Sequence, residues 1–158
     1  MKYKLICLDI DGTLLDNEKN LRPRVAEAIR RAAFRGIRMV LNSARMPAGV
    51  EPIEKELGVS CIKICDGGSY ILDGDMCISA EYFSTASMEG IFRQYAKKNN
   101  LNLWIFHDRD WYVTGMDDQT EKEIEIIGYH PQIVRVEELV SRWNKINIGP
   151  SKMLIHAR

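Results

Sequence analysis

Two carboxylates separated by one residue follow a short apolar run near the start of the chain. Asp9 and Asp11 come directly after residues 5–8, and Gly12 then ends the run. The run predicts a buried strand, and side chains two positions apart on extended backbone point to the same side. Adjacent carboxylates repel each other unless a cation lies between them, and Mg²⁺ suits an all-oxygen site that also holds a phosphate. The pattern therefore predicts a Mg²⁺ site at Asp9 and Asp11.

A strand–helix–strand succession positions this pair. Apolar residues in segment 23–33 recur at helical spacing, Gly36 ends the helix, and residues 37–41 read as a second strand. This succession predicts two parallel strands, and ligands of such sheets bind at the carboxyl ends of the strands. Ser43 follows the second strand, so we expect its hydroxyl beside the acid pair as a donor to a phosphate oxygen. The alternative is that Ser43 caps a helix that begins near Arg45.

The remaining sequence continues the first sheet and then changes character. Segment 61–65 predicts a third strand, and segment 70–79 predicts a hairpin. From residue 81 onward, helices and antiparallel strands alternate in an α+β pattern. The expected elements are helices over 88–96, from 118 and over 136–143, and strands over 101–106, 111–114, 146–148 and 152–156. Three cysteines lie in apolar runs and are expected to be reduced and buried: Cys7, Cys61 and Cys65.

The segment Asp9-Ile10-Asp11-Gly12-Thr13, with Ser43-Ala44-Arg45 one strand–helix unit later, resembles the first two motifs of the haloacid dehalogenase-like (HAD) superfamily. The resemblance is to its Cof-like, sugar-phosphatase-like group, which carries a C2-type cap. It implies an α/β fold with a partial Rossmann-like parallel sheet over 1–80 and an incomplete α+β cap segment over 81–158.

The same resemblance implies a Mg²⁺-dependent phosphomonoester hydrolase that acts on a small phosphorylated metabolite through an aspartyl-phosphate. Asp9 would be the nucleophile and Asp11 the general acid and base. Mg²⁺ would bind at Asp9 and Asp11. The implied phosphate contacts come from Ser43, Gly12, Thr13 and Arg45.

The family pattern is only partly present. Family members carry a lysine and a Gly-Asp motif after the cap, whereas the only Gly-Asp here is Gly74-Asp75 in the predicted hairpin. Relatives usually have Asn-Gly where this chain has Asp66-Gly67, and we expect Asp66 to be a turn residue. The chain is therefore expected to be truncated within its cap. Three functions stay open: an impaired phosphatase, a non-enzymatic remnant that binds phosphate or Mg²⁺ or self-associates, and a HAD-type phosphomutase.

The charge balance and the lengths of the apolar runs limit the classes of partner that we expect for this protein. The 22 basic residues balance the 22 acidic residues, so no global charge argues for nucleic acid or for a membrane surface. The first apolar run is too short for a signal peptide, and no run approaches a membrane-spanning length. We therefore expect a cytoplasmic location. The missing part of the sheet would leave the first strand at an exposed edge, which predicts a homo-oligomer.

Overall fold

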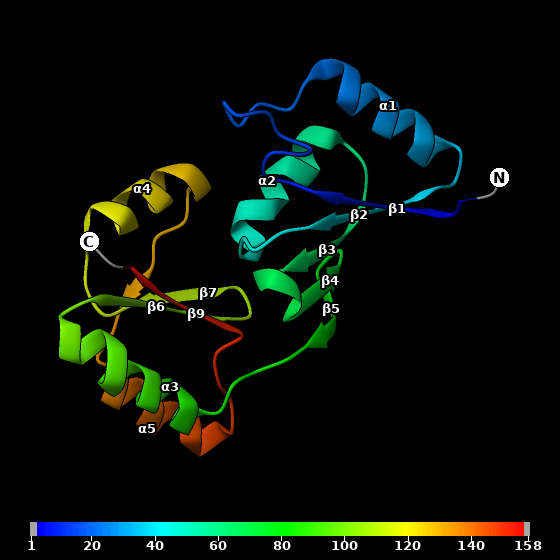
Figure 1. The fold of residues 1–158 in the computed structure, drawn as a ribbon. Coiled ribbons are helices and arrows are strands. Elements are labelled where there is room, and N and C mark those ends of the chain that lie inside the picture. Colours follow the sequence, from blue (N-terminus) through cyan, green and yellow to red (C-terminus); the bar gives the residue numbers. More distant parts are fainter. Residues whose placement is uncertain (1–2, 157–158) are drawn as a thin grey trace. The chain divides into compact units, whose positions relative to one another are not determined.

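The structure is a computed structural model that describes residues 3–156. The chain divides into two compact units, one up to Ser79 and one from Ala80 on, and each unit has its own sheet (Figure 1).

The first unit is built on a five-stranded sheet of order β1-β2-β3-β4-β5. The strands β1 and β2 are parallel, as predicted, β3 is parallel to β2, and β4 pairs antiparallel with β3. Its elements in chain order are β1 (Leu5–Asp9), α1 (Pro23–Phe34), β2 (Arg38–Asn42), α2 (Pro47–Leu57), β3 (Cys61–Cys65), the 3₁₀ turn η1 (Asp66–Gly68), β4 (Tyr70–Asp73) and β5 (Met76–Ala80).

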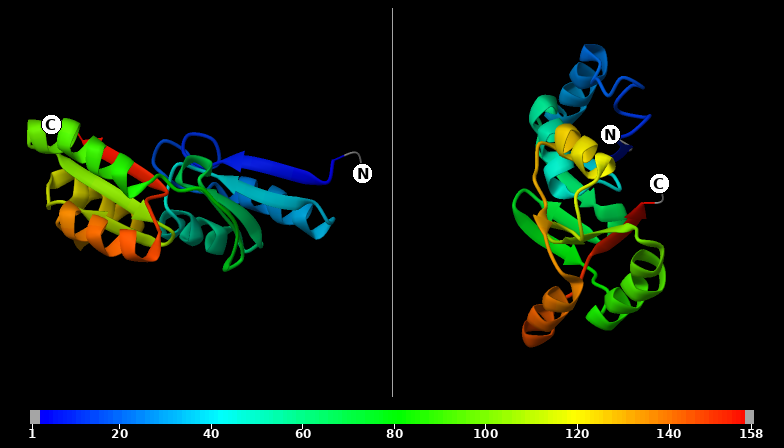
Figure 2. Two further views of the ribbon diagram at one scale, coloured as in Figure 1. Left: turned by 90° about the horizontal axis from the view of Figure 1, so that it is seen from below. Right: turned by 90° about the vertical axis from the view of Figure 1, so that its left-hand side faces the viewer.

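Both long helices of this unit lie on the same side of the sheet (Figure 2). Lys63 of β3 marks that side, because its ammonium pairs with Glu54 of α2. Strand register places Leu8 and Leu41 on the same face as Lys63. The helices themselves are locked together by Arg30 of α1, whose Nε donates to the carbonyl oxygen of Leu57 at the end of α2 (2.6 Å). This bond satisfies a carbonyl that the helix end leaves free.

The opposite face of the first sheet is open at its β1 edge, whereas Val40 of β2 on the same face is 4% exposed. It carries Leu5 and Cys7 of β1 and Ile62 and Ile64 of β3, and none of the described helices of this unit lies on it. The prediction of a buried first strand is wrong, because β1 is an edge strand and Leu5 is 51% exposed. Cys7 is exposed for the same reason, whereas Cys61 and Cys65 are buried as predicted.

The second unit has a four-stranded sheet of order β8-β7-β6-β9. Figure 1 shows α3 and α5 on one side of it and α4 on the other. Leu103, Ile105 and Trp143 are at the centre of the core between the sheet and α3 and α5. Its elements are α3 (Thr85–Ile91), the π-helical turn η2 (Phe92–Lys97), β6 (Asn102–His107), β7 (Asp110–Val113), α4 (Asp118–Ile127), β8 (Gln132–Ile133), α5 (Val136–Ile146) and β9 (Lys152–His156).

Two sequence predictions in this unit need correction. The segment predicted as one helix over 88–96 is an α-helix that passes into a π-helical turn. The strand predicted over 146–148 is absent, because α5 runs to Ile146 and Asn147 ends it with a φ of +55°. The antiparallel pairing of β6 with β7 and the strand at 152–156 are confirmed. Among the described residues, no helix has the length and apolar character needed to span a membrane.

Candidate active site

The acid pair lies where β1 ends and the chain folds back sharply. The carbonyl oxygen of Asp9 accepts a hydrogen bond from the Leu14 amide (3.1 Å), and that of Ile10 accepts one from the Leu15 amide (2.9 Å). Ile10 is fully buried and anchors the loop. Gly12 takes a φ of +79°, a conformation that glycine adopts without steric cost. The loop therefore leaves Asp9 and the residues after Ile10 at the surface.

Asp11 is held by two cations. Arg45 binds it with both arms of its guanidinium, Nε to Oδ2 at 2.9 Å and Nη2 to Oδ1 at 2.8 Å. Lys19 Nζ lies 2.8 Å from Oδ1. The hydrogen bond from Arg45 is the largest cause that lowers the pKa of Asp11, and with Lys19 it outweighs partial burial and brings the pKa from 3.8 to about 2. In this arrangement Asp11 is an anion at every physiological pH.

Asp9 differs from Asp11 in its surroundings. Its side chain is exposed at the end of β1. It has no ion-pair or hydrogen-bond partner among the residues that the structure describes. A carboxylate without a partner is available as a nucleophile or as a ligand of a hard cation.

Ser43 lies, like Asp9, at the carboxyl ends of the parallel strands. Asp9 is in register with Asn42, so Ser43 is the next residue beyond the neighbouring strand. Ser43 is 7% exposed, and its Oγ accepts a hydrogen bond from the Arg45 amide at 3.1 Å. The helix-cap alternative is wrong, because α2 begins later, at Pro47, without a side-chain cap. Ser43 instead holds the turn before α2, and its hydroxyl can still donate a proton.

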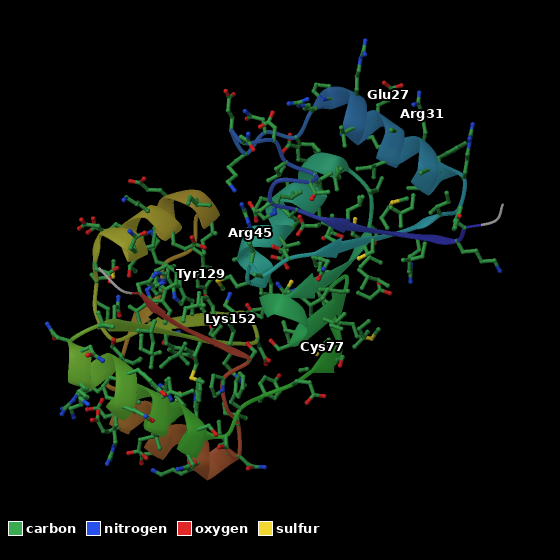
Figure 3. The ribbon with its side chains drawn as sticks, viewed as in Figure 1. Glu27, Arg31, Arg45, Cys77, Tyr129 and Lys152 are labelled. Atoms are coloured by element: carbon green, nitrogen blue, oxygen red, sulfur yellow. The ribbon has the colours of Figure 1, made fainter. Side chains whose placement is uncertain are left out.

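Arg45 is fixed from several sides just before α2 (Figure 3). Its side chain is only 16% exposed, and Nη1 donates to the Gly49 carbonyl oxygen at 3.3 Å. Its own carbonyl oxygen accepts from the Asp66 amide at 2.9 Å. Asp66 and Gly67 both have positive φ, as suits the predicted turn. These bonds tie the ends of β2 and β3 together and aim the guanidinium at Asp11.

The other predicted phosphate contacts, Gly12 and Thr13, are exposed in the loop after β1. The Thr13 amide makes only a long bond to the Ile10 carbonyl oxygen, 3.4 Å. The structure thus joins Asp11 directly to Arg45 and places Asp9, Ser43, Gly12 and Thr13 on segments that leave the same edge of the sheet.

The oxygen donors of the acid pair are few for a metal site. Within residues 3–156, no group of three or more metal-binding side chains comes together. Mg²⁺, however, is commonly held by one or two carboxylates, with water and substrate phosphate completing its shell. Asp9 and Asp11 fit that pattern if Asp11 shares its charge with the ion as well as with Arg45 and Lys19.

Lys19 contacts the acid pair but was not among the site residues expected from the sequence. It lies in the connector between β1 and α1, which carries no periodic pattern. A signal was present: Asp16 is followed four residues later by Asn20, and Asp and Asn favour closed turns. The turn is there, and it brings Lys19 back to Asp11.

Comparisons with known proteins agree with this geometry. Residues 6–157 match the family of haloacid dehalogenase-like hydrolases, and the chain belongs to that family. A 5-amino-6-(5-phospho-D-ribitylamino)uracil phosphatase of Bacillus subtilis is 24% identical over 86% of this chain and 66% of its own length.

Two solved structures share the fold. A Thermotoga maritima protein superposes with a TM-score of 0.78 at 20% identity, over 98% of this chain and 57% of that one. A HAD subclass IIB sugar phosphatase gives a TM-score of 0.75 at 17% identity, over 87% of this chain and 55% of that one. The predicted α/β fold with a Rossmann-like sheet is confirmed. The chain spans less than two thirds of the length of these relatives.

Proposed function

We propose that this chain carries the nucleophile and part of the phosphate site of a Mg²⁺-dependent phosphomonoester hydrolase for small phosphorylated metabolites. The observation that carries the proposal is the contrast within the acid pair. Asp9 is exposed and lacks a partner among the described residues, whereas Asp11 is held in place by Arg45. The family membership and the phosphatase names of relatives support it.

The chemistry has two steps. An Asp9 carboxylate oxygen attacks phosphorus, the bond from phosphorus to the ester oxygen breaks, and Asp11 gives a proton to the leaving oxygen. Water then attacks the aspartyl-phosphate, Asp11 takes a proton from that water, and phosphate leaves with Asp9 regenerated. Ser43 and Arg45 donate hydrogen bonds to phosphoryl oxygens as charge redistributes. Asp9 and Asp11 would hold Mg²⁺, which would neutralise part of the negative charge of the phosphate.

The position of Asp11 sets a requirement on this scheme. A carboxyl group that donates a proton must first be protonated, and the contact with Arg45 keeps the pKa of Asp11 at about 2. Arg45 must therefore loosen from Asp11 when substrate binds. The phosphoryl group offers Arg45 an alternative anion with matching bidentate geometry.

The test is hydrolysis of p-nitrophenyl phosphate with Mg²⁺ by the wild-type chain and by Asp9→Asn. Asparagine keeps the shape of the side chain and removes its nucleophilic charge, so we expect turnover by the wild type and a loss of at least about a hundredfold in the variant. Glu27→Gln, an exposed change on α1 away from Asp9, is the matched control. Equal activity of Asp9→Asn and an active wild type would refute the assignment of Asp9 as the nucleophile. An inert wild type would refute hydrolysis by this chain.

A second function, phosphate binding without turnover, is favoured by one observation. Both cations of the site already neutralise Asp11, so the proton that hydrolysis needs is hard to place there. A wild-type chain that binds inorganic phosphate but hydrolyses no ester would establish this function instead.

A further inference from the structure

The connector between β1 and α1 forms a closed turn organised by Asp16. Its Oδ1 accepts hydrogen bonds from the amides of Glu18 and Asn20, both at 3.0 Å. Its own amide donates to the Asn20 carbonyl oxygen (3.1 Å), and its carbonyl oxygen accepts from the Lys19 amide (2.9 Å). Bridges from Leu15 to Asp11 and to Leu21 close the base of the turn. The turn is therefore a fixed structure.

Lys19 occupies the unusual position of this turn. Its φ is +64°, in the left-handed region that Gly, Asn and Asp adopt most readily. Nothing in the backbone favours lysine there, so the side chain is what distinguishes the residue. That side chain reaches across eight positions of sequence and sets Nζ 2.8 Å from Asp11 Oδ1.

The two cations on Asp11 are held differently. Arg45 is 16% exposed, makes two bonds to Asp11 and is fixed to Gly49 as well. Lys19 is 57% exposed and makes the single Nζ contact. An exposed lysine–carboxylate pair is weak because water competes for both charges. Lys19 can therefore leave Asp11 at lower cost than Arg45, which has two bonds to Asp11 and a third to Gly49.

We propose that Lys19 is a further phosphate-binding residue of the site: its ammonium rests on Asp11 when the site is empty and turns to a phosphoryl oxygen when a phosphate ligand binds. The inference rests on the proposed function, because it assumes that the phosphoryl group is bound between Asp9 and Ser43. A mobile ammonium on a long stem suits this role as a point charge for phosphate.

A phosphate-binding Lys19 and a purely structural Lys19 predict different effects on Mg²⁺ binding when the ammonium is removed. In the empty site Lys19 and Mg²⁺ compete for the same Asp11 carboxylate. Removal of the ammonium should then weaken phosphate binding and strengthen Mg²⁺ binding. A lysine that only stabilised the loop would, on removal, weaken both.

The experiment is isothermal titration calorimetry with two probes, Mg²⁺ alone and inorganic phosphate in saturating Mg²⁺. The variants are Lys19→Met, Lys19→Arg and the control Lys55→Met, which removes an exposed lysine from the last turn of α2. For Lys19→Met we expect phosphate affinity to fall about tenfold, as for loss of one charged hydrogen bond, and Mg²⁺ affinity to rise. Lys19→Arg should restore most phosphate affinity, and Lys55→Met should match the wild type.

Three outcomes would overturn the inference. Phosphate affinity unchanged in Lys19→Met would show that the ammonium does not bind the ligand and would leave the proposed function intact. Loss of both affinities in Lys19→Met would assign the residue a structural role. A wild-type chain that binds no phosphate would refute the phosphate site itself, and the role of Lys19 with it.

Discussion

Replacement of Arg45 by methionine tests the electrostatics of the acid pair directly. The pKa of Asp11 falls from 3.8 to about 2, with the Arg45 hydrogen bond as the largest cause. A difference of about 1.8 in pKa corresponds to about 2.4 kcal/mol. Because the Asp11 side chain is 38% exposed, screening by water reduces this contribution to about 1 kcal/mol. In Arg45→Met the pKa of Asp11 should rise toward 3.8, because partial burial raises it and only Lys19 among the two cations remains to lower it.

The pKa change also fixes the sign of the pH dependence. A carboxyl whose pKa is lower in the folded protein stabilises the fold fully above its unfolded pKa of 3.8. That contribution is lost as the pH falls from 3.8 through about 2. We therefore expect the difference in free energy of unfolding between wild type and Arg45→Met, measured in urea, to be largest near about pH 6 and to shrink below about pH 4.

The assay for the pKa is carboxyl ¹³C NMR of Asp11 between about pH 7 and about pH 3. The wild-type resonance should stay constant over this range, whereas that of Arg45→Met should titrate within it. Arg38→Met is the matched control, since it removes an arginine paired with Asp73 at 3.0 Å and leaves Asp11 alone. An Asp11 resonance in Arg45→Met that still fails to titrate within this range would refute the reasoning.

Two further predictions concern the first unit as a whole. Lys63→Met leaves Glu54 without its buried cation, 2.7 Å away, and should lower the free energy of unfolding in urea by about 3 kcal/mol. Adding Glu54→Gln should recover part of the loss, and a single variant as stable as wild type would contradict the pairing. Leu5→Glu places a charge on the open face and should convert a wild-type dimer into a monomer in light scattering at micromolar concentration. Ile126→Glu, an exposed change in the second unit, should leave the dimer intact, and a monomeric wild type would refute self-association.

The sequence predicted the features of the site that depend on backbone repetition. Adjacent parallel strands joined by a helix have their carboxyl ends at the same end of the sheet. The order of the elements alone therefore places Asp9 and Ser43 near each other. The Arg45–Asp11 contact depends on a turn held by Ser43, and no periodicity encodes it. Lys19 reaches Asp11 only because the connector closes on Asp16.

The incorrect predictions for residues 5–8 and 146–148 have physical reasons as well. Apolar residues 5–8 predict burial, but burial of a strand needs a neighbouring strand on each side, and among the described strands β1 has a neighbour on one side only. Apolar residues at 146 and 148 alternate as in a strand, yet Ile146 closes α5 and Asn147 takes the left-handed conformation that ends a helix. Two apolar residues two positions apart do not distinguish a short strand from the end of a helix.

The open face and the acid pair are related, because β1 carries both the exposed apolar residues and Asp9. Sheets with parallel strands are normally covered on both faces, and here the uncovered face runs from Leu5 through Cys7 to Asp9 at its carboxyl end. A partner that covered this face up to its carboxyl end would also exclude water from the neighbourhood of Asp9. Exclusion of water strengthens each charge interaction at the site, including the attraction of Arg45 and Lys19 for a phosphoryl group. Association at β1 and reactivity of Asp9 should consequently rise together, because the same strand carries both.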